Sequence, residues 1–202
     1  MYHRGVSNAD SPRRGGRGAR ERILAAAVDV FYREGIHVTG VARLAEAASV
    51  SSRTFYQHFP SKNALVAAYL ERIDPPVERR LDEAGLSARE RLVSLFDPPG
   101  QEPETVRGCP FHNAVVEGAG ELPEVREIAR RHKDRFTQRL VDTAAEAGAR
   151  DPEELGRQLA VLFEGALALS TSCDDVAKMA AARSAAEVLV AAAVEQRPAG
   201  VG

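Results

Sequence analysis

The side chains best suited to chemistry in this 202-residue chain lie close together, between positions 51 and 62. They are donors and acceptors of the kind that read DNA: arginine bonds guanine, glutamine prefers adenine, and serine or threonine bonds bases or phosphate. The segment therefore predicts contacts with double-stranded DNA. The expected groove contacts are Ser51, Ser52, Arg53, Thr54 and Gln57, and the expected backbone contacts are Tyr56, His58 and Lys62.

The elements that must position these groups are two short helices, predicted over residues 41–48 and 52–58. Leu44 points inward from the first helix, Phe55 anchors the second, and Ala45 is small where the two must cross. This spacing predicts a helix-turn-helix, whose second helix enters the major groove. It also fits an ordinary helix pair of an all-α protein, so the spacing alone leaves both interpretations open.

The charge is unevenly divided along the chain. Residues 1–65 carry ten Lys/Arg against five Asp/Glu, although the whole chain has a formal net charge of −2. A basic head on an acidic body suggests that the head meets a polyanion. Residues 1–18 show no periodicity and are predicted to be a disordered basic arm, with or without a role at DNA. Residues 198–202 are predicted to be a disordered tail.

Helical periodicity dominates the rest of the sequence, and it predicts an all-α chain of eight or nine helices. There is no alternating β pattern and no glycine-rich phosphate loop. The longest wholly apolar run has seven residues, which is too short for a membrane span. No secretory signal follows the N-terminal arginines, so we expect a cytoplasmic protein without membrane contact.

The stretch from Ala19 to Leu70 resembles the DNA-binding domain of the tetracycline-repressor (TetR) family of regulators. The resemblance is carried by ERILAAAVDVFYREG, LAEAASVS and above all TFYQHFPSKNAL. It implies a three-helix DNA-reading head over residues 19–65 and a larger helical body over residues 66–197, which binds a small-molecule effector and dimerises. It also assigns Tyr56 and Lys62 to DNA phosphate.

Two positions depart from the family pattern. Gly40 stands where a Ser or Thr usually caps the second helix and touches phosphate, so that contact is lost or Thr39 replaces it at the DNA. Ser49 stands where a glycine usually makes the turn. A residue other than glycine with positive φ costs about 1 kcal/mol, which a folded domain absorbs.

The body offers candidate effector contacts but names no ligand. Four phenylalanines from four predicted helices either line an apolar pocket or fill a core. A histidine within an apolar stripe, such as His132, is more often a satisfied core residue than a ligand contact. Two further stretches, at residues 108–113 and 163–166, resemble segments of one branch of the family. The candidate effector contacts are Phe96, Phe111, His112, Glu117, His132, Phe136 and Phe163.

Metal binding and catalysis have weaker support. Cys109 and His112 have C-x-x-H spacing with Glu117 nearby, but a zinc site would need a fourth ligand such as His132. Burial of Cys109 as a small apolar side chain is the better interpretation. We therefore predict no metal, no cofactor and no catalytic residue, and keep an all-α enzyme using Cys109, His112 and Glu117 as an alternative.

The last two predicted helices, at about residues 152–172 and 175–194, are apolar over more than one stripe. Nine of the seventeen residues from Ala177 to Ala193 are alanine, which permits close helix approach. We expect a homodimer through a four-helix interface, although a buried terminal helix in a monomer also fits. The sequence thus predicts a repressor released from a palindromic operator by an effector. A sequence-tolerant DNA-packaging protein without an effector is the other alternative.

Overall fold

The computed structural model describes residues 17–73, 75–97, 108–118 and 123–194, and it confirms an all-α fold with no strand in these ranges. The predicted arm and tail lie almost wholly outside them.

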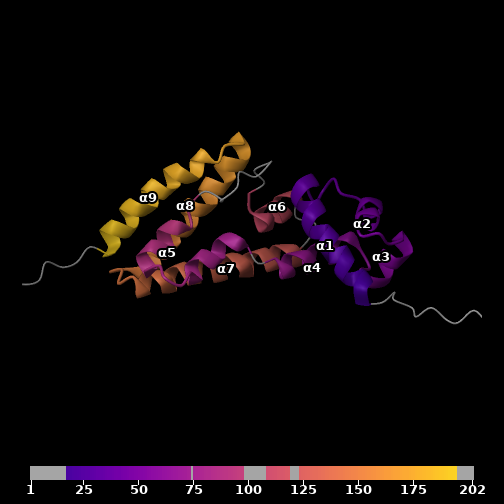
Figure 1. Cartoon of the computed structure of the whole chain (residues 1–202), viewed down its shortest axis with the longest axis horizontal. Coiled ribbons are helices and arrows are strands. Elements are labelled where there is room, and N and C mark those ends of the chain that lie inside the picture. Colours follow the sequence, from indigo (N-terminus) through magenta and orange to yellow (C-terminus); the bar gives the residue numbers. More distant parts are fainter. Residues whose placement is uncertain (1–16, 74, 98–107, 119–122, 195–202) are drawn as a thin grey trace, which may run out of the picture.

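Figure 1 shows α1 to α3 at one end of an elongated molecule, α9 at the other, and α7 running between. The elements are α1 (Arg17–Glu34), α2 (Val41–Ala47), α3 (Ser52–His58), α4 (Lys62–Arg72), the 3-10 helix η1 (Pro76–Asp82), α5 (Ala88–Ser94), α6 (Pro110–Glu117), α7 (Pro123–Glu146), α8 (Pro152–Cys173) and α9 (Ala177–Val194).

Local sequence signals account for several helix starts. Ser61 accepts the N–H of Ala64 at 3.1 Å and so caps α4, and Ser87 and Glu90 form a capping box at α5. Asp151 caps α8 ahead of Pro152. The sequence analysis did not predict η1, which begins at the second of the two prolines that follow α4. Proline suits the first position of a helix because its missing N–H has no partner there anyway.

The first hydrophobic core joins the head to part of the body. It includes Phe55 of α3 and Leu65 of α4, and it continues through Phe111 of α6 to Ile128 of α7. The predicted boundary at residue 65 falls inside α4, which contacts α1, α6 and α7. The head therefore shares packed side chains with the body and is not joined to it by a linker alone.

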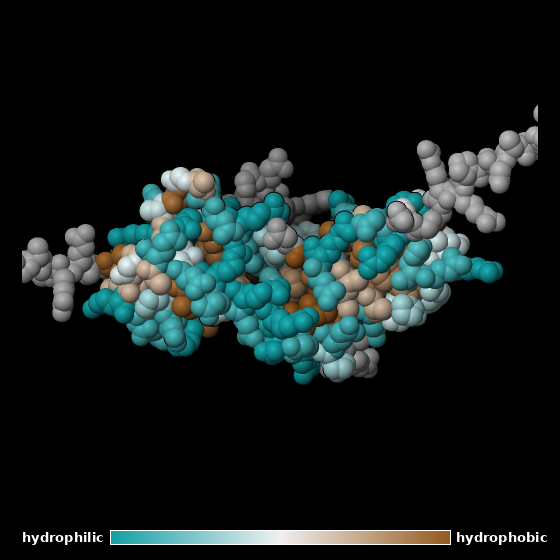
Figure 2. Space-filling model, turned by 90° about the horizontal axis from the view of Figure 1, so that it is seen from below, coloured by the Kyte–Doolittle hydropathy of each residue, from teal (hydrophilic) through white to brown (hydrophobic). Residues whose placement is uncertain are grey.

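The second core lies at the far end, where α5, α7, α8 and α9 enclose residues such as Leu92, Phe136, Phe163 and Val190. Figure 2 shows a face that is mostly hydrophilic, with apolar side chains visible in patches between the polar ones. None of the described helices combines the length and the apolar character that a membrane crossing requires.

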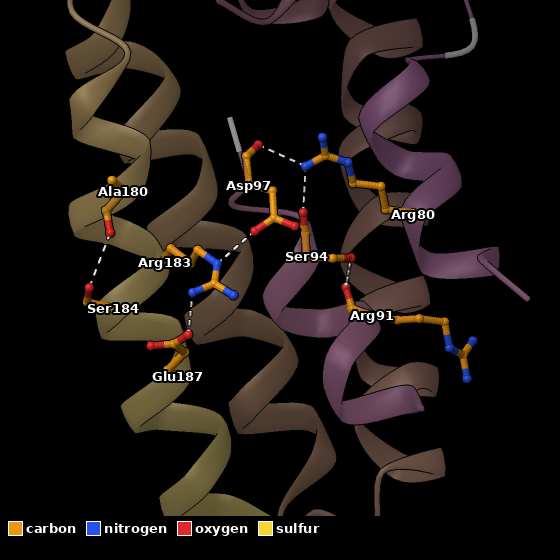
Figure 3. Close-up of polar contacts among 8 residues, drawn as sticks. All are labelled: Arg80, Arg91, Ser94, Asp97, Ala180, Arg183, Ser184 and Glu187. Carbon is orange, nitrogen blue, oxygen red and sulfur yellow. Dashed lines mark hydrogen bonds and ion pairs between the residues drawn. The ribbon is translucent and has the colours of Figure 1, made fainter. Parts of the chain in front are cut away.

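The end of α5 is tied to the elements on both sides of it (Figure 3). Nη1 of Arg80 donates to the carbonyl oxygens of Ser94 and Asp97 at 2.6 and 2.8 Å, which satisfies acceptors that a helix end leaves without partners. On the other side, Nε of Arg183 on α9 donates to Oδ1 of Asp97 at 2.7 Å. One short helix is thus held between η1 and α9.

At Gly156, α8 approaches the backbone of α7 without room for a side chain. A Cβ atom there would lie 2.8 Å from the backbone nitrogen and 2.9 Å from the Cα of Val141. We predict that Gly156→Ala lowers the free energy of unfolding by about 1 to 3 kcal/mol, because two backbones must separate to admit the methyl group. Chemical denaturation measures this. The exposed neighbour Gln158 serves as control, since Gln158→Ala should change stability by about 0.5 kcal/mol or less; equal effects would contradict the prediction.

Candidate nucleic-acid interface

The turn between α2 and α3 has the geometry of a helix-turn-helix. Ser49 adopts a left-handed φ of 51°, as expected for a position that usually holds glycine. The N–H of Val50 donates to the carbonyl of Ala45 at 2.9 Å, and Nε of Arg22 donates from α1 to the carbonyl of Ala48 at 3.2 Å. These bonds hold the end of α2 and set the direction in which α3 leaves the turn.

The orientation of α3 is set by Phe55, whose side chain is fully buried. Its ring meets Tyr56 edge-on, with centroids 5.4 Å apart, and packs against Phe59 at 6.1 Å. With Phe55 inside, the opposite side of the short helix faces outward. Ser52, Arg53, Tyr56 and Gln57 are exposed there, and Thr54 and His58 are half-buried. The predicted face is therefore accessible, and its contacts with DNA stay a prediction.

Ser51 has a structural role that the sequence analysis missed. Its Oγ accepts the N–H of Thr54 at 3.0 Å and lies 2.9 Å from the Thr54 hydroxyl, so it caps α3. A serine directly before a predicted helix is the usual signal of such a cap. Ser51 is exposed at the same time, so one side chain stabilises the helix and faces the predicted groove.

The structure corrects the prediction for Thr39. Its side chain is 2% exposed, and its hydroxyl donates to the carbonyl of Gly35 at 2.5 Å. The next residue, Gly40, begins α2 without any side-chain cap. Thr39 therefore does not replace the hydroxyl that Gly40 lacks. Its own hydroxyl is turned into the head, where it bonds the carbonyl of Gly35 just after α1.

Lys62 begins α4 at the edge of the head. Its Nζ donates to the carbonyl of His37 at 3.0 Å, and the side chain is half-buried. Burial lowers the pKa of Lys62, and the charge of Glu117 opposes that shift. The ammonium predicted to meet DNA phosphate is thus already held against the loop between α1 and α2.

The four phenylalanines of the body fill the two cores. The Phe163 ring packs against Phe96 and Phe136 with centroids 5.8 and 5.3 Å apart, and all three are buried. Phe111 belongs to the other core and stacks on His132 with ring centroids 3.6 Å apart. Of the two alternatives left open, this packing supports the filled core.

Two further effector candidates also have other roles. His132 is buried, and its Nε2 lies 3.0 Å from Oε1 of Glu78. It is therefore a core histidine with a polar partner, which was the more common of the two roles considered for it. Glu117 turns toward the head, where its Oε2 accepts the N–H of His37 at 2.7 Å. Of the seven predicted effector contacts, only His112 lines the cavity described next.

That cavity lies between α6 and α8 and has a volume of about 420 Å³, its open mouth included. Two of its lining residues bond Lys133 of α7: Nζ donates to Sγ of Cys109 at 3.1 Å and pairs with the carboxylate of Glu164. The sequence analysis singled out the two segments that meet here but attached no ligand to them. The lining residues are Gly108, Cys109, His112, Asn113, Glu164, Leu167, Ala168, Thr171 and Ser172.

The residues proposed for a metal site or an enzyme active site do not gather at one place. Cys109 and His112 line the cavity, whereas Glu117 bonds the head and His132 bonds Glu78. Within the described ranges, no group of three or more His, Cys, Asp or Glu side chains could hold a metal ion.

Apolar side chains are exposed on the last two helices. Val161 and Leu169 of α8 are 74% and 55% exposed, and Val188 of α9 is 68% exposed. Exposed apolar side chains gathered on neighbouring elements are typical of interaction surfaces. The four-helix dimer interface predicted on these two helices stays a prediction.

Two family models match this chain. Residues 23–69, from within α1 to within α4, match the model described as bacterial regulatory proteins, tetR family. Residues 88–186 match the tetracyclin repressor-like C-terminal domain, which covers α5 to α8 and half of α9. The boundary between the two models includes η1.

Individual relatives agree with the models. The transcriptional regulator RutR of Escherichia coli is 37% identical over 81 residues, which is 38% of this chain and 38% of RutR. TcmR of Streptomyces glaucescens is 29% identical over 142 residues, 70% of this chain and 57% of TcmR. The chain therefore spans well under two thirds of the curated relatives that it matches.

Solved structures cover more of the molecule. A TetR-family transcriptional regulator from Streptomyces coelicolor is 28% identical, with a TM-score of 0.73 over 88% of this chain and 97% of that one. The reduced form of E. coli NemR has a TM-score of 0.74 over 84% and 95% of the two chains, at 19% identity, so it shares the fold.

The cap at Ser51 generates a prediction about the head. Ser51→Ala should lower the free energy of unfolding by about 1 kcal/mol, because the N–H of Thr54 loses its acceptor. Ser52→Ala removes a hydroxyl from the exposed neighbour and should be nearly neutral. Thermal unfolding of the two variants measures the difference. Equal melting temperatures would show that the cap contributes nothing.

Proposed function

Because the chain belongs to the tetR family of bacterial regulatory proteins, we propose that it is a homodimeric transcriptional repressor that a small-molecule effector releases from a palindromic operator. The observation that carries the proposal is the outward face of α3, which is accessible because Phe55 is buried behind it. DNA-packaging and enzymatic functions are not favoured, since the matched relatives are transcriptional regulators.

Sequence would be read by the exposed groups of α3. The Arg53 guanidinium can form two hydrogen bonds with guanine, and the Gln57 amide can do the same with adenine. Tyr56 and Lys62 lie at the end of α3 and the start of α4, where they would contact phosphates and fix the register. A protein that makes such contacts would act in the cytoplasm, where bacterial DNA lies.

Dimerisation would pair two such heads. The exposed apolar side chains of α8 and α9 support an interface in which these helices meet their counterparts in a second copy. Two recognition helices about 34 Å apart would then read successive turns of the major groove in a palindromic site.

The cavity between α6 and α8 is our candidate effector site. The first turn of α6 supplies Cys109, His112 and Asn113 to it, and the last residue of the same helix, Glu117, bonds the head. An effector in each cavity would favour a state whose heads no longer match the half-site separation. Shifting occupancy from nearly full to nearly empty requires a preference of about 5.5 kcal/mol for that state.

The two classes of DNA contact can be separated by substitution. On an operator selected from a random DNA pool, Arg53→Ala should lose about 1 to 3 kcal/mol of affinity and relax specificity at particular base pairs. Lys62→Ala should weaken binding to all sequences alike and reduce the salt slope by about 1, because it removes a phosphate contact. Mobility-shift titrations measure both. Arg126→Ala, exposed on α7, controls for the lost charge. If both head variants retain full affinity, the groove assignment is wrong.

The dimer interface is tested on α8. We predict that Leu169→Glu converts the dimer to a monomer, because the exposed leucine would be replaced by a charge that the proposed interface buries without a partner. Sedimentation measures the oligomeric state, and operator affinity should fall by more than about tenfold as the second half-site is lost. Val28→Glu, at another exposed apolar position on α1, should leave the dimer intact. A dimeric Leu169→Glu protein would contradict the interface.

A further inference from the structure

The backbone of His37 is held from both sides by charged groups of two other elements. Oε2 of Glu117, the last residue of α6, accepts the His37 N–H at 2.7 Å. Nζ of Lys62, the first residue of α4, donates to the His37 carbonyl at 3.0 Å. One loop residue therefore links a helix of the body to a lysine on the edge of the head.

Hydrogen bonds hold this part of the loop in place more than packing does. Ile36 and Thr39 are buried and fix its two ends, but His37 and Val38 between them are exposed. In Figure 1, α6 lies at the junction of head and body, where it contacts α4 and α7. The middle of this loop, at His37 and Val38, has no buried side chain to fix it, and the hydrogen bond from Glu117 holds it instead.

The Lys62 ammonium has three N–H donors. One bonds the His37 carbonyl, which holds Nζ beside the first turn of α4, and two are left for other acceptors. Burial lowers the pKa of Lys62, and the nearby charge of Glu117 raises it, so Glu117 also helps to keep this group cationic.

We propose that Glu117 is a positioning residue for DNA binding, which holds Lys62 through the backbone of His37 at the place where its ammonium meets a DNA phosphate. The inference rests on the proposed function, since it needs a head that binds DNA. It goes further by giving a body residue, eighty positions from His37 in the chain, a defined part in that binding.

Two effects of Glu117 oppose each other and can be separated. Its negative charge repels DNA phosphates, whereas its hydrogen bond orders the loop and Lys62. Glu117→Gln removes the charge and keeps an acceptor oxygen, so binding should stay within about twofold of the wild type or strengthen. Glu117→Ala removes both. Glu117→Asp keeps the charge but shortens the side chain, so it should break the hydrogen bond.

The experiment titrates the full-length dimer with the selected operator between about 50 and 200 mM salt, using fluorescence anisotropy. Glu117→Ala and Glu117→Asp should weaken binding roughly fivefold and flatten the salt slope by about 0.9, as Lys62→Ala does. The double variant of Glu117→Ala with Lys62→Ala should bind no more weakly than Lys62→Ala alone, because each substitution removes the same contact, that of Lys62 with a DNA phosphate. Glu124→Ala, exposed on α7, controls for the change in charge.

The outcomes separate the two proposals. If the wild-type protein shows no preference for any DNA sequence, the proposed function fails and this inference fails with it. If the wild type binds its operator, but Glu117→Ala and Glu117→Asp match Glu124→Ala or their losses add fully to that of Lys62→Ala, only this inference is overturned. Melting temperatures of all variants identify any that do not fold, and the Gln and Asp variants then carry the comparison.

Discussion

Burial of the Phe55 ring is the constraint on which the DNA-facing surface depends. Each residue of an α-helix is rotated by about 100° from the one before, so fixing one side chain inside the core orients all the others on a seven-residue helix. Phe55 is enclosed by the core that α1, α2 and α4 build. A rotation of α3 by one residue would turn Thr54 or Tyr56 into the core in place of Phe55 and expose the Phe55 ring.

The same core continues beyond the head, and this continuity gives the body a physical path to α3. Phe111 of α6 and Ile128 of α7 belong to the cluster that contains Phe55. Phe111 stacks on His132, which bonds Glu78 of η1, so α6, α7 and η1 meet at one buried junction. Packed interiors deform little, so a shift of α6 at the cavity would be felt at the head through side chains as well as through Glu117.

Much of this protein could be predicted from local sequence patterns. The periodicity of apolar residues gave the all-α class, and the serine, aspartate and proline residues found at several helix starts are the types that favour a start. Ser49 was expected at positive φ and has it. His132 was weighed as a satisfied core residue and is one. The helices, their caps and the turn depend on residues close in the sequence, because helix propensity, capping and turn strain are local. The partners of His132, Glu78 and Phe111, come from other elements.

The identity of each buried partner was decided by the tertiary structure. Thr39 has the right type for a phosphate contact, but the head turns its hydroxyl inward. Three of the four phenylalanines that fit a pocket by spacing fill one core, while the cavity opens beside Cys109 and Glu164. The sequence alone determined which side chains lie on a common helix face. The rotation and crossing of the helices decided which faces meet, because contacts such as that of Glu117 with His37 join residues that no local pattern relates.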